Sequence, residues 1–102
     1  MAQVTFQKLV SGIGMEPGEI HHWWWNNAPS DRAWSFSVDP WAMWDGTKWM
    51  PAKAEIIQVY QTHKYSPGTA IGDPHEREIH VRLKNTGSYV CNYELYMTSI
   101  RA

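Results

Sequence analysis

Hydrophobic and polar residues alternate along most of this chain with a period of two, and a helical period is nearly absent. Because successive side chains of a β-strand point to opposite faces of its sheet, this alternation predicts strands. We expect six long strands, over residues 4–10, 19–25, 33–38, 54–63, 78–84 and 89–100. The less regular segment 40–53 is expected to hold a small hairpin around a tight turn at Asp45-Gly46.

Residues that favour turns separate these strands. Ser11–Gly14 is expected to close the first strand, and Asn85–Gly87 is expected to turn the chain before the last one. Asp39-Pro40 is expected to end the third strand, because proline has no N–H group with which to continue a β-ladder.

The alternation also assigns side chains to the two faces of a sheet. In segment 54–63 it places Ile57 and Val59 on one face and Ile56 and Tyr60 on the other. In segment 78–84 the inward residues are expected to be Ile79, Val81 and Leu83, with His80, Arg82 and Lys84 outward. The core is therefore expected to depend on these alternate positions.

The number and spacing of the strands predict an all-β fold. We expect a single antiparallel β-sandwich domain over residues 1–102, with six to eight strands, immunoglobulin-like or jelly-roll-like character and little or no helix. The run from Ile79 to Gly87, which ends in Asn85-Thr86-Gly87, resembles the Asn-Thr-Gly turn of immunoglobulin-like adhesion and accessory domains. With the strand that follows, the resemblance covers about a fifth of the chain. It implies a sandwich and says nothing about a ligand.

Tryptophan is the most unevenly distributed residue of the chain. All seven tryptophans lie between Trp23 and Trp49, and Trp23, Trp24 and Trp25 are consecutive. In a strand, Trp24 would point away from its two neighbours, unless a bulge shifts the register. At least one large ring would then face solvent, a ligand, another subunit or a loop folded over it, whereas the alternation around Trp34 places that ring in the core.

Composition and charge narrow the classes of partner. The chain has 102 residues, a mass of 11.8 kDa, a net charge of −1 and no run of lysine or arginine, so we expect no nucleic-acid partner. No apolar stretch reaches the roughly 18 residues of a membrane-spanning helix, so we expect no membrane span. No signal peptide is recognisable at the N-terminus, which leaves the localisation open. The single cysteine, Cys91, excludes an internal disulfide and is expected to be a small core residue.

No motif of the chain predicts catalysis. The Gly-x-Ser-x-Gly elbow, the phosphate-binding glycine loop and the zinc-protease helix motif do not occur, so we expect no enzyme and no cofactor. His21 and His22 are adjacent and would face opposite sides of a strand, which is unsuited to chelation of one ion. We therefore expect no metal site.

The sequence instead favours a non-catalytic binding module with an exposed tryptophan surface, and a carbohydrate as its ligand. Aromatic faces can pack on the apolar faces of sugar rings while nearby polar side chains hydrogen-bond the hydroxyl groups. The expected ligand-binding residues are Trp24, Asn27, Trp41, Trp44, Asp45 and Trp49. The alternatives are a self-assembling or partner-binding structural protein whose aromatic surface is an interface, giving a homo-oligomer or a complex with another protein, and a component of a toxin or phage particle.

Overall fold

The computed structural model describes residues 3–26, 32–63 and 77–101, and these residues form β-strands joined by turns and short connections. The strands are β1 (Gln3–Met15), β2 (Ile20–Asn26), β3 (Arg32–Trp41), β4 (Met43–Trp44), β5 (Trp49–Met50), β6 (Ala54–His63), β7 (Arg77–Asn85) and β8 (Cys91–Arg101). The prediction of an all-β fold is therefore confirmed.

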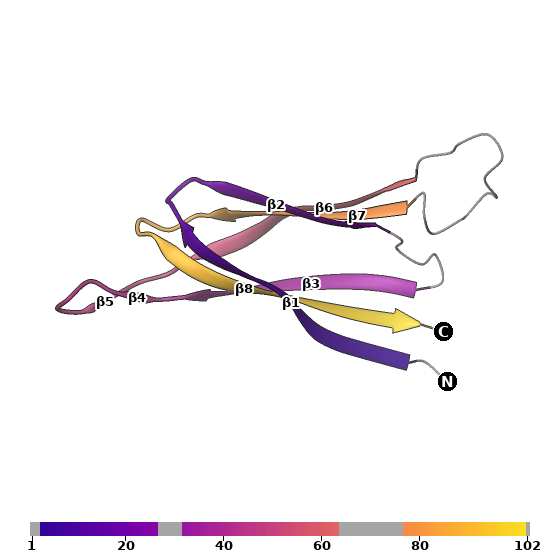
Figure 1. The fold of residues 1–102 in the computed structure, drawn as a ribbon, viewed down its shortest axis with the longest axis horizontal. Helices are drawn as coiled ribbons and strands as arrows, with labels where there is room; N and C mark the ends of the chain where they lie inside the picture. The colour runs from indigo at the N-terminus through magenta and orange to yellow at the C-terminus, as the bar shows by residue number, and fades with distance from the viewer. Residues whose placement is uncertain (1–2, 27–31, 64–76, 102) are drawn as a thin grey trace.

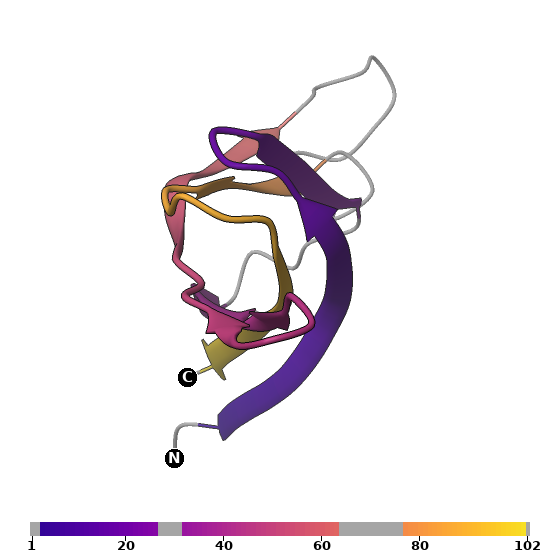
Figure 2. The ribbon, with the colours of Figure 1, turned by 90° about the vertical axis from the view of Figure 1, so that its left-hand side faces the viewer.

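Six of the strands form two antiparallel sheets that face each other as a sandwich (Figures 1 and 2). Sheet A has the strand order β1-β8-β3, and sheet B has the order β2-β7-β6. The predicted hairpin exists as the pair β4-β5, which lies at one end of the sandwich (Figure 1). We call the face of each sheet that is turned toward the other sheet inner, and the opposite face outer.

The core lies between the two central strands, β7 and β8. Every second residue of both strands is buried, as the alternating pattern of β7 predicts. The buried hydrophobic residues are Met15, Ile79, Val81, Leu83, Cys91, Tyr93, Leu95 and Met97. The alternation of buried and partly exposed residues is most regular here because a central strand has a neighbour on both sides and one face packed against the other sheet.

Cys91 is a buried core residue, as predicted, and burial raises the pKa of its thiol. The reactive species toward disulfide reagents is the thiolate, which burial disfavours. We expect no reaction of Cys91 with dithiobis(nitrobenzoic acid) in the folded protein and complete reaction in denaturant, measured by absorbance. Rapid stoichiometric labelling of the folded protein would contradict this placement.

Asn85 connects the turn between β7 and β8 to the connection between β1 and β2, at the end of the core. Its side-chain Nδ2 donates hydrogen bonds to the carbonyl oxygens of Met15 and Tyr89 (both 2.8 Å), and its Oδ1 accepts one from the N–H of Gly87 (2.9 Å). Its backbone N–H donates to the Glu19 carbonyl oxygen, and its own carbonyl oxygen accepts from the N–H of Gly18. One buried side chain thus holds the β7–β8 turn against the β1–β2 connection.

Three boundary or face predictions are wrong. Ser11–Gly14 does not end β1, which continues to Met15 with irregular register between Lys8 and Val10 and between Gly12 and Met15. Asp39-Pro40 does not end β3, because β3 is an edge strand and an edge strand tolerates a residue without an N–H donor.

The third correction concerns the faces of β6. Ile56 pairs with Leu83 and Gln58 with Arg82, so Ile57 is an extra residue in the ladder. The bulge places Ile56 and Val59 on the inner face and Tyr60 on the outer face, opposite His80. Ile56 and Tyr60 therefore do not share a face.

Trp34 occupies the predicted face of β3 but is less deeply buried than expected. It points to the inner face in register with buried Ser99, and its side chain is half-buried. The Arg32 guanidinium carbon lies 5.8 Å from the centre of its ring. Trp34 is thus at the margin of the core rather than within it.

Candidate functional site

The three consecutive tryptophans point alternately to the two faces of sheet B. Trp23 and Trp25 are half-buried on the inner face, whereas 54 % of Trp24 is exposed on the outer face. The β2–β7 register runs without a shift from Ile20 to Asn26. The strand-parity prediction is confirmed, because no bulge interrupts the run.

The predicted site residues do not form one surface. Trp24 lies on the outer face of sheet B, and Trp41 lies on the outer face of sheet A, in register with Asn92. Trp44 and Trp49 pair across the β4-β5 hairpin, with ring centres 5.4 Å apart and edge-to-face geometry. Asn27 lies outside the described residues.

Asp45 forms the turn of the hairpin. Its Oδ1 accepts hydrogen bonds from the backbone N–H groups of Thr47 and Lys48 (both 2.8 Å) and from the Thr47 hydroxyl (2.9 Å). These hydrogen bonds lower the pKa of the Asp45 carboxyl group, and the backbone N–H of Thr47 makes the largest contribution. A ligand hydroxyl would have to use Oδ2, so the predicted ligand contact of Asp45 stays a prediction.

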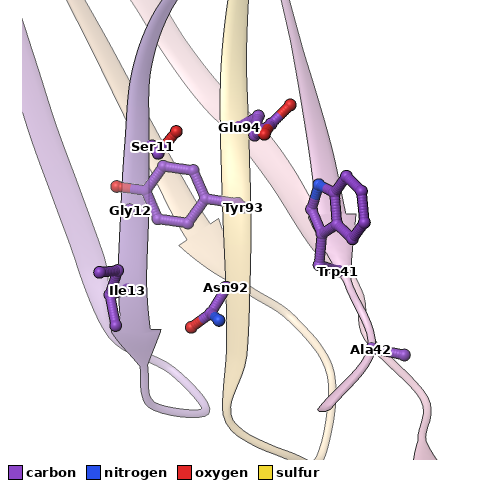
Figure 3. A pocket seen from close by; sticks show the side chains of 8 residues that line it. All are labelled: Ser11, Gly12, Ile13, Trp41, Ala42, Asn92, Tyr93 and Glu94. Atoms are coloured by element: carbon purple, nitrogen blue, oxygen red, sulfur yellow. The ribbon is translucent and has the colours of Figure 1, made fainter.

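A pocket of about 290 Å³ lies beside Trp41 (Figure 3). Its lining comes from three strands of sheet A and the residue after β3: Ser11, Gly12, Ile13, Trp41, Ala42, Asn92, Tyr93 and Glu94. Ser11 is opposite Glu94 and Trp41 is opposite Asn92 in the ladders, which places these four side chains on the outer face. The pocket therefore combines one indole ring, 53 % exposed, with three polar side chains.

Two of these polar side chains are held by neighbours. Asn92 Oδ1 accepts a hydrogen bond from the N–H of Gly14 (2.9 Å). Glu94 Oε2 accepts one from the Tyr96 hydroxyl, and Glu94 Oε1 lies 3.6 Å from Lys8 Nζ. The hydrogen bond to Glu94 raises the pKa of the Tyr96 hydroxyl. Asn92 Nδ2 can donate to a ligand, and the Glu94 carboxylate can accept from one.

The pocket meets the core at Gly12 and Tyr93. The two residues are opposite each other in the β1–β8 ladder, and the Tyr93 ring extends toward β1 at Gly12 (Figure 3). A side chain at Gly12 would occupy the position of that ring. The close packing of β1 against Tyr93 at this point therefore depends on a residue without a side chain.

The Tyr93 hydroxyl is fixed by two inward residues of β2. Trp23 Nε1 donates to it (2.8 Å), and a second hydrogen bond joins it to His21 Nδ1 (2.5 Å). Since an indole nitrogen can only donate, the Tyr93 hydroxyl oxygen accepts from Trp23, whereas the donor in the bond with His21 depends on the tautomer of the imidazole. His21 Nε2 then lies 3.3 Å from Glu19 Oε1. Burial, the largest cause, raises the pKa of Tyr93.

A second aromatic group occupies the outer face of sheet B. Trp24, His80 and Tyr60 are in register across β2, β7 and β6, and the rings of Tyr60 and His80 are stacked with centres 4.5 Å apart. Hydrogen bonds join His22 Nε2 to His80 Nδ1 (2.8 Å) and His80 Nε2 to Glu78 Oε1 (3.3 Å). The sequence did not predict this group, because the bulge at Ile57 decides the face of Tyr60.

Within the described ranges 3–26, 32–63 and 77–101, no three His, Cys, Asp or Glu side chains are grouped so that they could hold a metal ion. No helix capable of crossing a bilayer occurs in that same part of the chain.

No protein-family model, curated protein or solved structure matches this chain.

Proposed function

We propose that this protein is a non-catalytic carbohydrate-binding module and that the sugar binds in the pocket beside Trp41. The observation that supports the proposal is the combination of a half-exposed indole ring with Ser11, Asn92 and Glu94 around one pocket of about 290 Å³. That volume is near the lower end of the range of about 300–1,000 Å³ for small-molecule sites. A ligand of one or two sugar rings fits this scale.

The chemistry of the lining matches the two surfaces of a sugar ring. A pyranose presents C–H groups on its faces, which pack against an indole, and hydroxyl groups around its edge. Asn92 Nδ2 would donate to one hydroxyl, and Glu94 would accept from hydroxyls with the greater strength of a charged acceptor. Because Gly14, Tyr96 and Lys8 already hold these groups, little side-chain freedom would be lost on binding.

The other exposed tryptophans are less suited to this role. Trp24 is not part of this pocket, and its neighbours His22, His80 and Glu78 direct polar atoms toward one another. Trp44 and Trp49 pack edge-to-face against each other. Trp41, in contrast, stands beside polar side chains in the pocket described above.

The test is a glycan array with the purified protein, followed by calorimetric titration of the strongest sugar. Removal of a ring that buries its face on a ligand costs ~2–3 kcal/mol by area, so Trp41→Ala should weaken binding about 30- to 150-fold. Trp24→Ala is the matched control, because that ring has a similar exposure on the opposite sheet. Equal losses in both variants, or none in Trp41→Ala, would contradict the assignment.

A second candidate function, recognition of a protein partner, is favoured by the β4-β5 hairpin. Trp44 and Trp49 are exposed there at one end of the sandwich (Figure 1). Aromatic residues of this kind dominate the binding energy of many protein interfaces. A blank glycan array from a folded protein would favour this candidate over the sugar pocket.

A further inference from the structure

The first half of β1 is exposed on both of its faces. From Gln3 to Lys8 every residue is exposed, although the strand is paired with β8 along this whole stretch. Val4 and Phe6 are 66 % and 64 % exposed on the outer face, and the alternate residues Gln3, Thr5 and Gln7 point the other way. This half-strand buries little hydrophobic surface within the described chain.

The same half-strand forms an edge of sheet A. In the described part of the chain β8 is its neighbour on one side, so the backbone N–H and C=O groups of the other side face outward. Natural edge strands are commonly protected against pairing by charged residues or proline. Gln3–Gln7 contains neither.

Phe6 and its surroundings extend this apolar surface onto β8. The Phe6 ring is stacked on Tyr96, with ring centres 5.3 Å apart and an angle of 8° between the planes. Val4 is in register with Ile100, which is also exposed. The outer face thus presents an apolar surface directly beside an unpaired edge.

We propose that β1 pairs in antiparallel orientation with β1 of a second copy of this chain, around a two-fold axis at Thr5. Neighbouring strands place directly opposite residues on the same face. An axis at Thr5 sets Val4 opposite Phe6 of the second copy, in both directions, and Gln3 opposite Gln7. Apolar side chains then meet on the outer face and amides on the other face.

Three other registers, with the axis at Phe6, between Val4 and Thr5, or between Thr5 and Phe6, are less favourable. An axis at Phe6 sets Val4 opposite Lys8, which places a charge against an apolar side chain. An axis between two residues sets Val4 opposite Gln7 or Thr5, which point to the other face of the sheet. The sequence is therefore self-complementary in the register centred on Thr5.

Such a pair would form one sheet of six strands, β3-β8-β1-β1-β8-β3. A two-fold axis perpendicular to a sheet keeps the outer faces of both copies on the same side. The two Trp41 pockets would then open in one direction, and a surface with many sugars could engage both, raising the apparent affinity. The pairing itself does not rest on the proposed sugar binding.

The test is the mass in solution, measured by sedimentation equilibrium over a range of protein concentrations. We expect twice 11.8 kDa for the unmodified chain. The double variant Val4→Lys, Phe6→Lys places like charges opposite each other and should have the single-chain mass. The double variant Val4→Glu, Phe6→Lys places opposite charges there and should restore the double mass. Circular dichroism checks that both variants fold.

A cysteine at the axis tests the register. Directly opposite residues have Cα atoms about 4.5–5.5 Å apart, within the roughly 4.4–6.8 Å range of a disulfide. Thr5→Cys should therefore form a covalent dimer under mild oxidation, whereas the control Ser37→Cys, on the edge strand β3, should not. A single-chain mass at all concentrations would overturn the proposal, as would failure of the Glu–Lys variant to regain the double mass. A sugar-binding monomer would refute the pairing alone, and a dimer without sugar binding would refute the proposed function alone.

Discussion

Replacement of Asn85 by alanine should lower the free energy of unfolding by about 4 kcal/mol. The change removes two donors and one acceptor from a site with no solvent exposure. The buried hydrogen bond to the Met15 carbonyl and the two part-buried ones, to the Tyr89 carbonyl and from the Gly87 N–H, would be lost. An unsatisfied buried group costs roughly 1–3 kcal/mol, and a part-buried one costs less. Urea denaturation followed by circular dichroism measures the loss.

Two variants control this expectation. Asn85→Asp keeps the shape and the acceptor for Gly87 but removes both donors and buries a carboxyl group, so it should cost at least as much as alanine. Asn92→Ala removes the single side-chain bond with Gly14 at a more exposed position and should cost about 1 kcal/mol or less. A loss below about 1 kcal/mol for Asn85→Ala would show that Asn85 does not hold the two turns together.

Replacement of Gly12 by alanine should lower the free energy of unfolding by about 3 kcal/mol, the upper end of the usual cost of overpacking. An added methyl group would overlap the Tyr93 ring and its hydroxyl oxygen. The ring has no easy way to move aside, because Trp23 and His21 hold its hydroxyl group. The same denaturation measurement applies.

Gly14→Ala separates this steric effect from the general cost of losing a glycine. Gly14 has a φ of 66°, but nothing lies within 4 Å of an added Cβ, so its replacement should cost only about 1–2 kcal/mol of backbone strain. The additional cost of Gly12→Ala should also fall sharply in a Tyr93→Leu background, since the overlapping ring is then absent. The same cost in both backgrounds would contradict the steric explanation.

The sequence-based predictions were most accurate for strands that pack one face against the core and expose the other. In β7 the alternation of Ile79, Val81 and Leu83 is enough to identify a half-buried strand and its inner face. The same reasoning predicted the outward position of Trp24. It failed at Ile57, because one extra residue reverses the faces of all that follow and no local signal marks it.

The remaining errors depend on contacts between distant parts of the chain. Gly12 resembles a turn residue in sequence, but it lies within β1 because Tyr93, far along the chain, needs the space of its missing side chain. Pro40 resembles a strand end, but whether proline is tolerated depends on whether β3 is an edge or a central strand. Strand order is not encoded in local periodicity.

The candidate site was predictable in part for the same reason. Trp41 could be named as a candidate exposed ring because it lies in the irregular segment 40–53. Asn92 and Glu94 could not be assigned to it, because they reach the pocket only through the β3–β8 and β1–β8 registers. Trp24 and Trp41 belong to different sheets and lie on separate surfaces, and the ligand contacts predicted for them stay predictions.

The central claim is that a sugar binds beside Trp41, and nuclear magnetic resonance tests it most directly. The strongest sugar of the glycan array, or a panel of common monosaccharides if the array is blank, is titrated into ¹⁵N-labelled protein. We expect the Trp41 indole N–H and the Asn92 side-chain amide signals to shift together with one saturating curve, while the Trp24 indole N–H signal stays in place. Shifts confined to Trp24, Trp44 or Trp49, or no shifts at millimolar sugar, would contradict the account.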